Sequence, residues 1–166
     1  MENSVFLEKL LKAYERYYSI NKENVKEPFD VEAKFVMHGE QYILVKAARI
    51  ADIDANEFVY FKLEDDLSLE QLKNLADKAW KCGLENFVPY YGHKNSDVTL
   101  IVIADSLCDD VKKNIRKVKH SVSYKLGLYG WSNFKLAVKD LSTGMVYCNR
   151  MGSDVKKLVQ KIQAED

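Results

Sequence analysis

The sequence predicts a single α+β domain in which a mixed or antiparallel sheet is packed by helices. Residues 98–104 are apolar at nearly every position and rich in β-branched side chains, which is typical of a central strand covered on both faces. Other segments alternate apolar and polar residues with the two-residue period of a half-buried strand. Segments with helical periodicity separate these strands, so the expected element order is α-βββ-α-β-α-βββ-α.

The first part of the chain is expected to form one helix and three strands. Leucine and tyrosine side chains recur at helical spacing over residues 4–20, which predicts an amphipathic helix. Residues 31–37 alternate as a strand, and a short polar turn leads into a second β-rich run at residues 42–50, so a hairpin is expected. Residues 58–63 are expected to form the third strand.

The best-defined helix begins after Ser68. Ser68 and Gln71 have the spacing of a capping box, in which each side chain accepts a hydrogen bond from the backbone amide of the other residue. Leu72 begins the buried stripe of this helix. Gly83 is expected to end the helix in a left-handed conformation.

The later elements follow the same logic. A helix over residues 107–120 is expected to be capped by Ser106 and to bury Val111, Ile115 and Val118. Three alternating segments and a closing helix capped by Ser153 come next: strands at residues 122–128, 134–138 and 146–148, and a helix that reaches residue 162.

Length and composition fit one domain with its own core. The chain has 166 residues, which is near the usual domain size, and no linker rich in Pro, Ser or Gly divides it. A single domain over residues 1–166 is therefore expected. The segments 4–83 and 106–164 share the order α-βββ-α, which is the pattern that an ancient duplication would leave.

The net charge and the cysteine content indicate the environment in which the protein is expected to work. The 25 basic and 25 acidic side chains cancel, so no overall field attracts nucleic acid or anionic lipid. The three cysteines are widely spaced, which is typical of free thiols in a reducing compartment. The first residues do not resemble a secretory signal, and no apolar run approaches the ~20 residues that cross a bilayer. We expect a cytoplasmic protein with no membrane contact.

No motif in the sequence indicates a metal or cofactor site. The three histidines, His38, His93 and His120, lie in separate predicted elements, whereas zinc ligands usually come in close pairs. No glycine-rich phosphate loop stands between a strand and a helix. We therefore expect neither a bound metal nor a cofactor.

An acidic group follows the carboxyl end of the central strand. Asp105, Asp109 and Asp110 lie where open sheets often bind ligands, and clustered carboxylates can hold Mg²⁺. The alternative, which we favour, is that they stabilise the positive end of a helix dipole.

A basic group occupies the helix expected after this acidic group. Its members are Lys112, Lys113, Arg116, Lys117 and Lys119. Such a surface can contact phosphates. The alternative, again favoured, is a solvated outer face whose cations complement the carboxyl end of the helix.

Aromatic residues suggest a third candidate surface. Tyr90 and Tyr91 lie in an expected loop, and Tyr129 and Trp131 flank a glycine. Exposed tyrosine and tryptophan suit contacts with protein partners. The alternative is that these side chains cover the sheet, as most large aromatic residues do.

Two short segments invite comparison with a known fold. The expected third strand contains Tyr60-Phe61-Lys62, and the first contains Glu32-Ala33-Lys34 with Asp30 two residues before it. Over residues 4–105 the element order resembles that of the PD-(D/E)XK, or restriction-endonuclease-like, nucleases, which place E-x-K on their third strand. In that comparison Lys62 matches the lysine position but Tyr60 replaces the acid, which implies a core without catalysis.

The function expected from these residues is non-catalytic. No complete catalytic or cofactor set is visible, so we expect a domain that acts through contacts with a protein partner or with a second copy of itself as a homodimer. The alternative is a nucleic-acid-binding or inactive nuclease-derived domain that uses the helix at residues 107–120. An enzyme that acts through the acidic group is the third interpretation.

Overall fold

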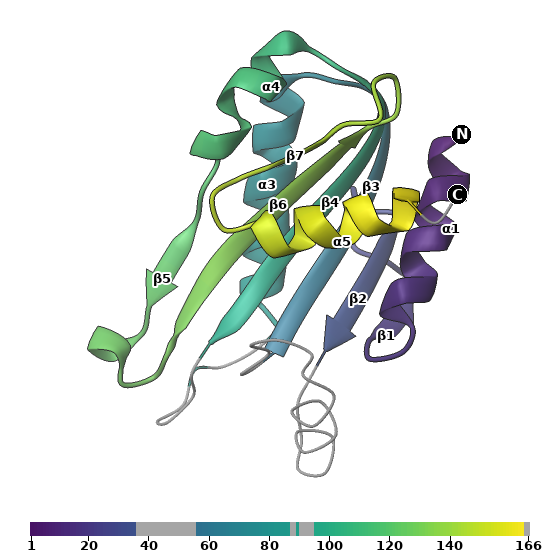
Figure 1. Cartoon of the computed structure of the whole chain (residues 1–166). Helices are drawn as coiled ribbons and strands as arrows, with labels where there is room; N and C mark the ends of the chain where they lie inside the picture. The colour runs from purple at the N-terminus through teal and green to yellow at the C-terminus, as the bar shows by residue number, and fades with distance from the viewer. Residues whose placement is uncertain (36–55, 87–88, 90–94, 165–166) are drawn as a thin grey trace.

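A computed structural model describes residues 1–35, 56–86, 89 and 95–164 of the chain (Figure 1). The described residues form a mixed seven-stranded sheet in the order β1-β2-β3-β4-β6-β5, with β7 also paired to β6. The three long strands β3, β4 and β6 run parallel in the middle, and the outer pairs are antiparallel. The strand bounds are β1 Ser19–Asn21, β2 Val31–Phe35, β3 Asn56–Leu67, β4 Ser96–Leu107, β5 Ser121–Ser123, β6 Trp131–Asp140 and β7 Val146–Cys148.

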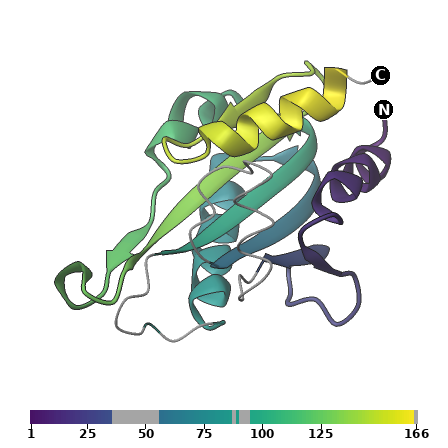
Figure 2. The same cartoon turned by 60° about the horizontal axis from the view of Figure 1, so that its bottom comes forward.

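Helices of the described residues cover both faces of this sheet (Figures 1 and 2). α1 (Asn3–Tyr14) and α5 (Ser153–Ala164) pack on one face. α3 (Leu69–Leu84) and α4 (Asp109–Asn114) pack on the other. The predicted α+β domain, with a mixed sheet packed by helices, is confirmed. None of the described helices is long and apolar enough to span a membrane.

The central strand β4 contributes side chains to both layers of the hydrophobic core. Leu100 and Val102 point into the core under α3 and α4, whereas Ile101 and Ile103 point into the core under α1 and α5. All four side chains are fully buried. The sequence prediction of a strand covered on both faces is therefore confirmed.

The capping box of α3 is confirmed, but the role expected of Gly83 is wrong. The Gln71 amide donates to Ser68 Oγ at 3.3 Å, and the Ser68 amide donates to Gln71 Oε1 at 2.9 Å. The helix continues through Gly83 to Leu84. A Cβ at Gly83 would lie 2.3 Å from Val98 Cγ2, so this glycine permits close packing of α3 on β4.

The helix expected over residues 107–120 is much shorter than predicted. β4 extends to Leu107, and the Ser106 hydroxyl donates to the carboxylate of Asp66 instead of capping a helix. α4 ends at Asn114 and continues as the 3₁₀ turn η1 (Ile115–Lys117). Val111, Ile115 and Val118 are buried as expected. The backbone leaves the α-helix after Asn114, but these three side chains keep their places in the core, because tertiary packing overrides helix propensity.

Two other expected elements also end early. The strand predicted over residues 122–128 stops at Ser123, because Lys125 and Leu126 adopt positive φ angles of 45° and 54° in the 3₁₀ turn η2 (Lys125–Gly127). The first helix ends at Tyr14, and residues 19–21 form β1, which pairs with β2. The strand expected at residues 42–50 lies outside the described residues.

The proposed duplication remains a prediction. In the first half, β1, β2 and β3 pair in chain order. In the second half, β5 and β7 both pair with β6, β5 at its beginning and β7 near its end.

Candidate functional site

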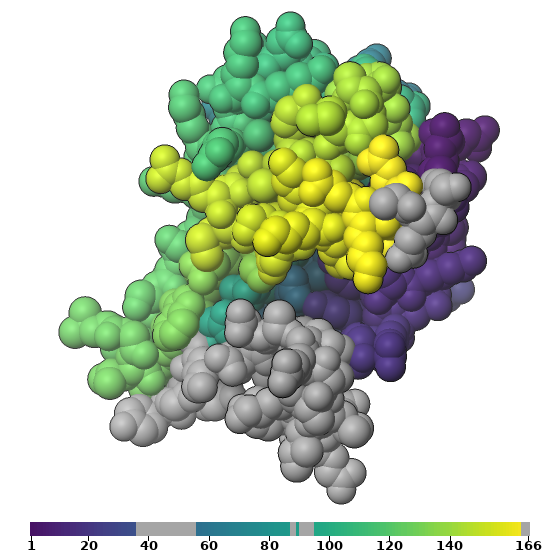
Figure 3. Space-filling model, viewed as in Figure 1, coloured from purple at the N-terminus to yellow at the C-terminus, as the bar shows by residue number. Residues whose placement is uncertain are grey.

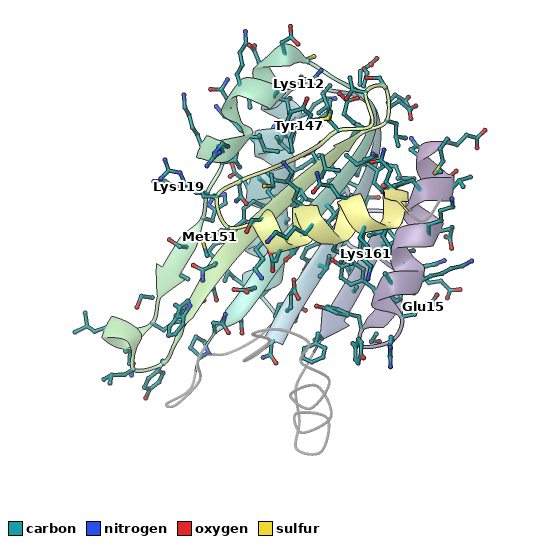
Figure 4. The ribbon with its side chains drawn as sticks, viewed as in Figure 1. Glu15, Lys112, Lys119, Tyr147, Met151 and Lys161 are labelled. Atoms are coloured by element: carbon teal, nitrogen blue, oxygen red, sulfur yellow. The ribbon has the colours of Figure 1, made fainter. Side chains whose placement is uncertain are left out.

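A groove of about 310 Å³ lies between the α4–η1 segment and the chain that leads from β7 into α5. Figure 3 shows the green surface of α4 and its continuation meeting the lime-to-yellow surface of the β7–α5 segment. We call this feature the basic groove. Its lining residues are Lys112, Ile115, Arg116, Tyr147, Cys148, Asn149, Arg150, Ser153 and Lys156. Figure 4 shows Lys112 and Tyr147 close together where the two segments meet.

All charged side chains among the described residues that line the groove are cations. Lys112, Arg116, Arg150 and Lys156 line it, and no carboxylate among the described residues does. Within the described part of the chain, Arg116, Arg150 and Lys156 form no ion pair. Because cations of like sign repel one another, their convergence without counter-charges favours an anionic ligand.

Lys112 is the anchored member of this set. Its Nζ lies 3.4 Å from Oδ2 of Asp140, a fully buried residue at the end of β6. Asp140 Oδ1 accepts hydrogen bonds from the amide of Ser142 at 3.1 Å and from its hydroxyl at 2.6 Å. Burial by itself would raise the pKa of Asp140, but these hydrogen bonds and the Lys112 ammonium outweigh it and hold that pKa below its ordinary value.

Asn149 fixes the backbone on both sides of the groove. Its Oδ1 accepts from the Leu136 amide at 3.0 Å, and its Nδ2 donates to the carbonyls of Phe134 at 3.0 Å and Val118 at 2.9 Å. The side chain is buried, so these bonds are shielded from water. They join β6, the end of η1 and the residue before Arg150 into one unit.

The start of α5 adds to the positive potential. Ser153, the first residue of this 12-residue helix, lines the groove. The first amides of a helix lack intrahelical acceptors and carry its positive dipole end, so they favour an anion nearby. Gly152 just before the helix has no room for a side chain, because a Cβ there would lie 2.4 Å from the carbonyl oxygen of Leu136.

A second polar cluster lies under α1 and α5, on the opposite face of the sheet from α3. We call Glu57, Asp97, Lys135 and Asp154 the ion network. Lys135 Nζ lies 3.2 Å from Asp97 Oδ2 and 2.8 Å from Asp154 Oδ2. Glu57 is the direct partner of Asp97 in the β3–β4 ladder. Acids and a lysine from three parallel strands and one helix therefore converge here.

The ion network is satisfied by its own members and neighbours. Glu57 Oε1 accepts from Thr99 Oγ1 at 2.8 Å, and Oε2 accepts from the Tyr18 hydroxyl. Burial raises the pKa values of Glu57 and Asp97, although Lys135 opposes this. Burial would lower the pKa of Lys135, but the charges of Glu57 and Asp97 raise it overall. Among the described residues, no three side chains of His, Cys, Asp or Glu are placed so that they could hold a metal ion together.

The acidic residues predicted from the sequence are all exposed. Asp105 lies near the end of β4, and Asp109 and Asp110 form the first turn of α4. They are not part of a metal-ligand group among the described residues. Acids in the first turn of a helix are in the place where they stabilise its dipole.

The predicted basic residues divide into two sets. Lys112 and Arg116 line the groove, whereas Lys113, Lys117 and Lys119 are exposed outside its lining. The expected stripe along one helix does not form, because α4 ends at Asn114. Figure 4 shows Lys119 away from Lys112, on the chain that descends toward β5.

The predicted aromatic residues are partly described. Tyr90 and Tyr91 lie outside the described residues. Tyr129 and Trp131 follow η2 in the β5–β6 hairpin, whose end projects from the sheet (Figure 1); Tyr129 is half-buried, whereas Trp131, Leu126 and Leu128 are exposed. Lys125 Nζ lies 4.5 Å from the centre of the Tyr129 ring. This hairpin tip is therefore an exposed apolar surface.

Residues quoted for the nuclease resemblance form a local ion pair. Lys62 Nζ lies 3.4 Å from Asp30 Oδ2, and Glu32 Oε1 accepts from the Lys26 amide at 2.9 Å. The resemblance itself stays a prediction.

Sequence reasoning missed half of the groove and the whole ion network. Arg150 and Lys156 are separated from Lys112 by β5, β6 and β7, and no repeat or motif links them. The one available signal for this half of the groove was the short predicted strand at residues 146–148, which ends just before the predicted helix start at Ser153. Helix starts attract anions.

The chain belongs to a family with a matching model. The model described as "Domain of unknown function (DUF8052)" matches residues 2–161. Neither the search of curated proteins nor the search of solved structures gave a match.

Proposed function

We propose that this member of the DUF8052 family binds single-stranded nucleic acid in the basic groove. The observation that carries the proposal is the convergence of four cations and a helix start on one groove, with no carboxylate among the described residues that line it. Three of those cations form no ion pair within the described part of the chain. Phosphate groups would supply the missing negative charge.

Two features favour a polymer over a single phosphate. Lys113, Lys117 and Lys119 are exposed on the same segment as Arg116, so positive charge continues beyond the groove. Tyr147 is half-buried in the groove and offers a ring on which a base can stack. A positive groove combined with an aromatic ring is the usual means of holding single strands without reading their sequence.

Charge reversal tests the proposal directly. Arg116→Glu combined with Arg150→Glu places one negative charge on each wall of the groove. Both side chains are exposed and form no ion pair in the described part of the chain, so the fold should be retained. Lys112 is left unchanged because it neutralises buried Asp140. Fluorescence anisotropy with labelled oligothymidylate and oligouridylate should show binding by wild type and none by the double variant.

The matched control carries the same change in net charge elsewhere. Lys12→Glu with Lys73→Glu alters exposed lysines on α1 and α3, away from the groove. This control should bind as wild type does. The proposal fails if wild type does not bind either oligonucleotide near physiological salt, or if the two double variants weaken binding equally.

A second candidate function is self-association through the β5–β6 hairpin tip. Leu126, Leu128 and Trp131 are exposed there, and large apolar side chains often anchor protein interfaces. Sedimentation velocity over a wide concentration range should then show a dimer that Leu126→Ser with Trp131→Ser abolishes. The control, Val5→Ser with Met145→Ser, changes exposed apolar residues elsewhere and should leave the dimer intact.

A further inference from the structure

A second cavity, of about 280 Å³, lies between the start of α1, the end of β6 and the end of α5. Its lining residues are Met1, Phe6, Lys139, Leu141, Gly144 and Gln163. Figures 1 and 2 both show the start of α1 and the end of α5 close together at this part of the molecule. The volume is near the lower end of the roughly 300–1,000 Å³ typical of small-molecule sites.

Lys139 is the only cationic side chain that lines this cavity among the described residues, and it is 2% exposed; Met1, which also lines it, carries the α-amino group. Its Nζ donates to the Gly144 carbonyl at 2.6 Å and to Gln163 Oε1 at 2.5 Å. An ammonium group has three N–H donors, so one remains without an oxygen acceptor in the described structure. The Phe6 ring centre lies 5.4 Å from Nζ, and its face gives partial compensation for the charge.

No carboxylate of the described residues forms an ion pair with Lys139. The adjacent Asp140 pairs with Lys112 and is therefore committed to another cation. A buried charge without a directly paired counter-ion is costly: burial lowers the pKa of Lys139, although the negative charge of neighbouring Asp140 opposes this. A ligand that brings one negative charge would remove this cost.

We infer that this cavity binds a small monocarboxylate with an apolar tail. The Lys139 ammonium forms no ion pair among the described residues and can bind a carboxylate, and Phe6, Leu141 and the Met1 side chain offer apolar surface for the tail. The site is separate from the basic groove, so either can exist without the other.

The test uses hexanoate as the probe and two-dimensional ¹H–¹⁵N NMR of the labelled full-length protein. Hexanoate should shift the amide signals of Phe6, Leu141 and Gly144 in a saturable way. Acetate has the charge without the tail, and 1-hexanol has the tail without the charge. Both should bind at least about tenfold more weakly, because each lacks one of the two interactions.

Lys139→Met keeps most of the side-chain volume and removes the charge. It should weaken hexanoate binding by about tenfold or more, whereas Lys161→Met, at an exposed position of α5, should not change it. The inference is overturned if hexanoate produces no saturable shift, if Lys139→Met binds it as wild type does, or if 1-hexanol binds as tightly as hexanoate. The comparison of the three compounds on wild type decides the matter even if Lys139→Met does not fold.

Discussion

Asn149→Ala should be one of the most destabilising single changes in the second half of the chain. The Asn149 side chain satisfies the Leu136 amide and the carbonyls of Phe134 and Val118 at distances of 2.9–3.0 Å. Alanine removes all three bonds at a site that is 2% exposed. Each of the three backbone groups then loses a partner in a place that water does not readily reach.

The expected magnitude follows from those three groups. Leaving one buried donor or acceptor unsatisfied costs about 1–3 kcal/mol. The space left by the side chain can admit a water molecule that restores part of the bonding, so we expect a loss of about 3–6 kcal/mol in the free energy of unfolding. The groove should also lose its shape, because Asn149 joins its walls.

Urea denaturation followed by circular dichroism measures this loss. Asn114→Ala is the matched control: its Nδ2 donates to the Asp110 carbonyl at 2.9 Å and its Oδ1 accepts from Lys117 Nζ at 3.4 Å, both in an exposed setting. That variant should lose no more than about 0.5 kcal/mol. A loss below about 1 kcal/mol for Asn149→Ala would show that the three hydrogen bonds do not hold this part of the fold.

Three further predictions concern packing, pH and metals. Gly83→Ala should lower the free energy of unfolding by about 1–3 kcal/mol, since its Cβ would lie 2.3 Å from Val98 Cγ2; an unchanged urea midpoint would contradict this. Burial raises the pKa of Glu57, so the folded protein holds this proton more tightly than the unfolded chain, and the contribution of Glu57 to stability declines as the pH rises above about 4, the ordinary pKa of a glutamate. Glu57→Gln should therefore gain stability relative to wild type as the pH rises above that value, and a constant difference between their unfolding free energies would refute the assignment. A chelator should leave the melting temperature unchanged, and a lowered one would reveal a structural metal.

The fold was predictable where local signals and packing agree. The apolar run of β4 and the capping box of α3 appear in the structure as expected, because each follows from residues adjacent in sequence. The helix expected over residues 107–120 was wrong because a periodic apolar stripe is also satisfied by a six-residue α-helix, a 3₁₀ turn and an extended residue. Periodicity specifies which side chains are buried, not which backbone carries them.

The candidate sites were less predictable because they are assembled across the sheet. Lys112 and Arg116 were identified as a basic surface, but Arg150 joins them only through the pairing of β7 with β6. Lys135 in β6 and Glu57 in β3 come together because both strands flank β4 in parallel register. No single-sequence pattern specifies such pairings between distant strands.

The salt dependence of oligothymidylate binding tests the proposed role of the basic groove most directly. For single strands, each phosphate contact contributes about 0.7 to the slope of log K against log salt concentration. The four cations of the groove contribute about −3 to the slope for wild type, contacts with Lys113, Lys117 or Lys119 add to this, and Arg116→Ala with Arg150→Ala should make the slope shallower by about 1.5. A double variant whose slope equals that of wild type would show that the nucleic acid, if it binds at all, does not bind in the groove.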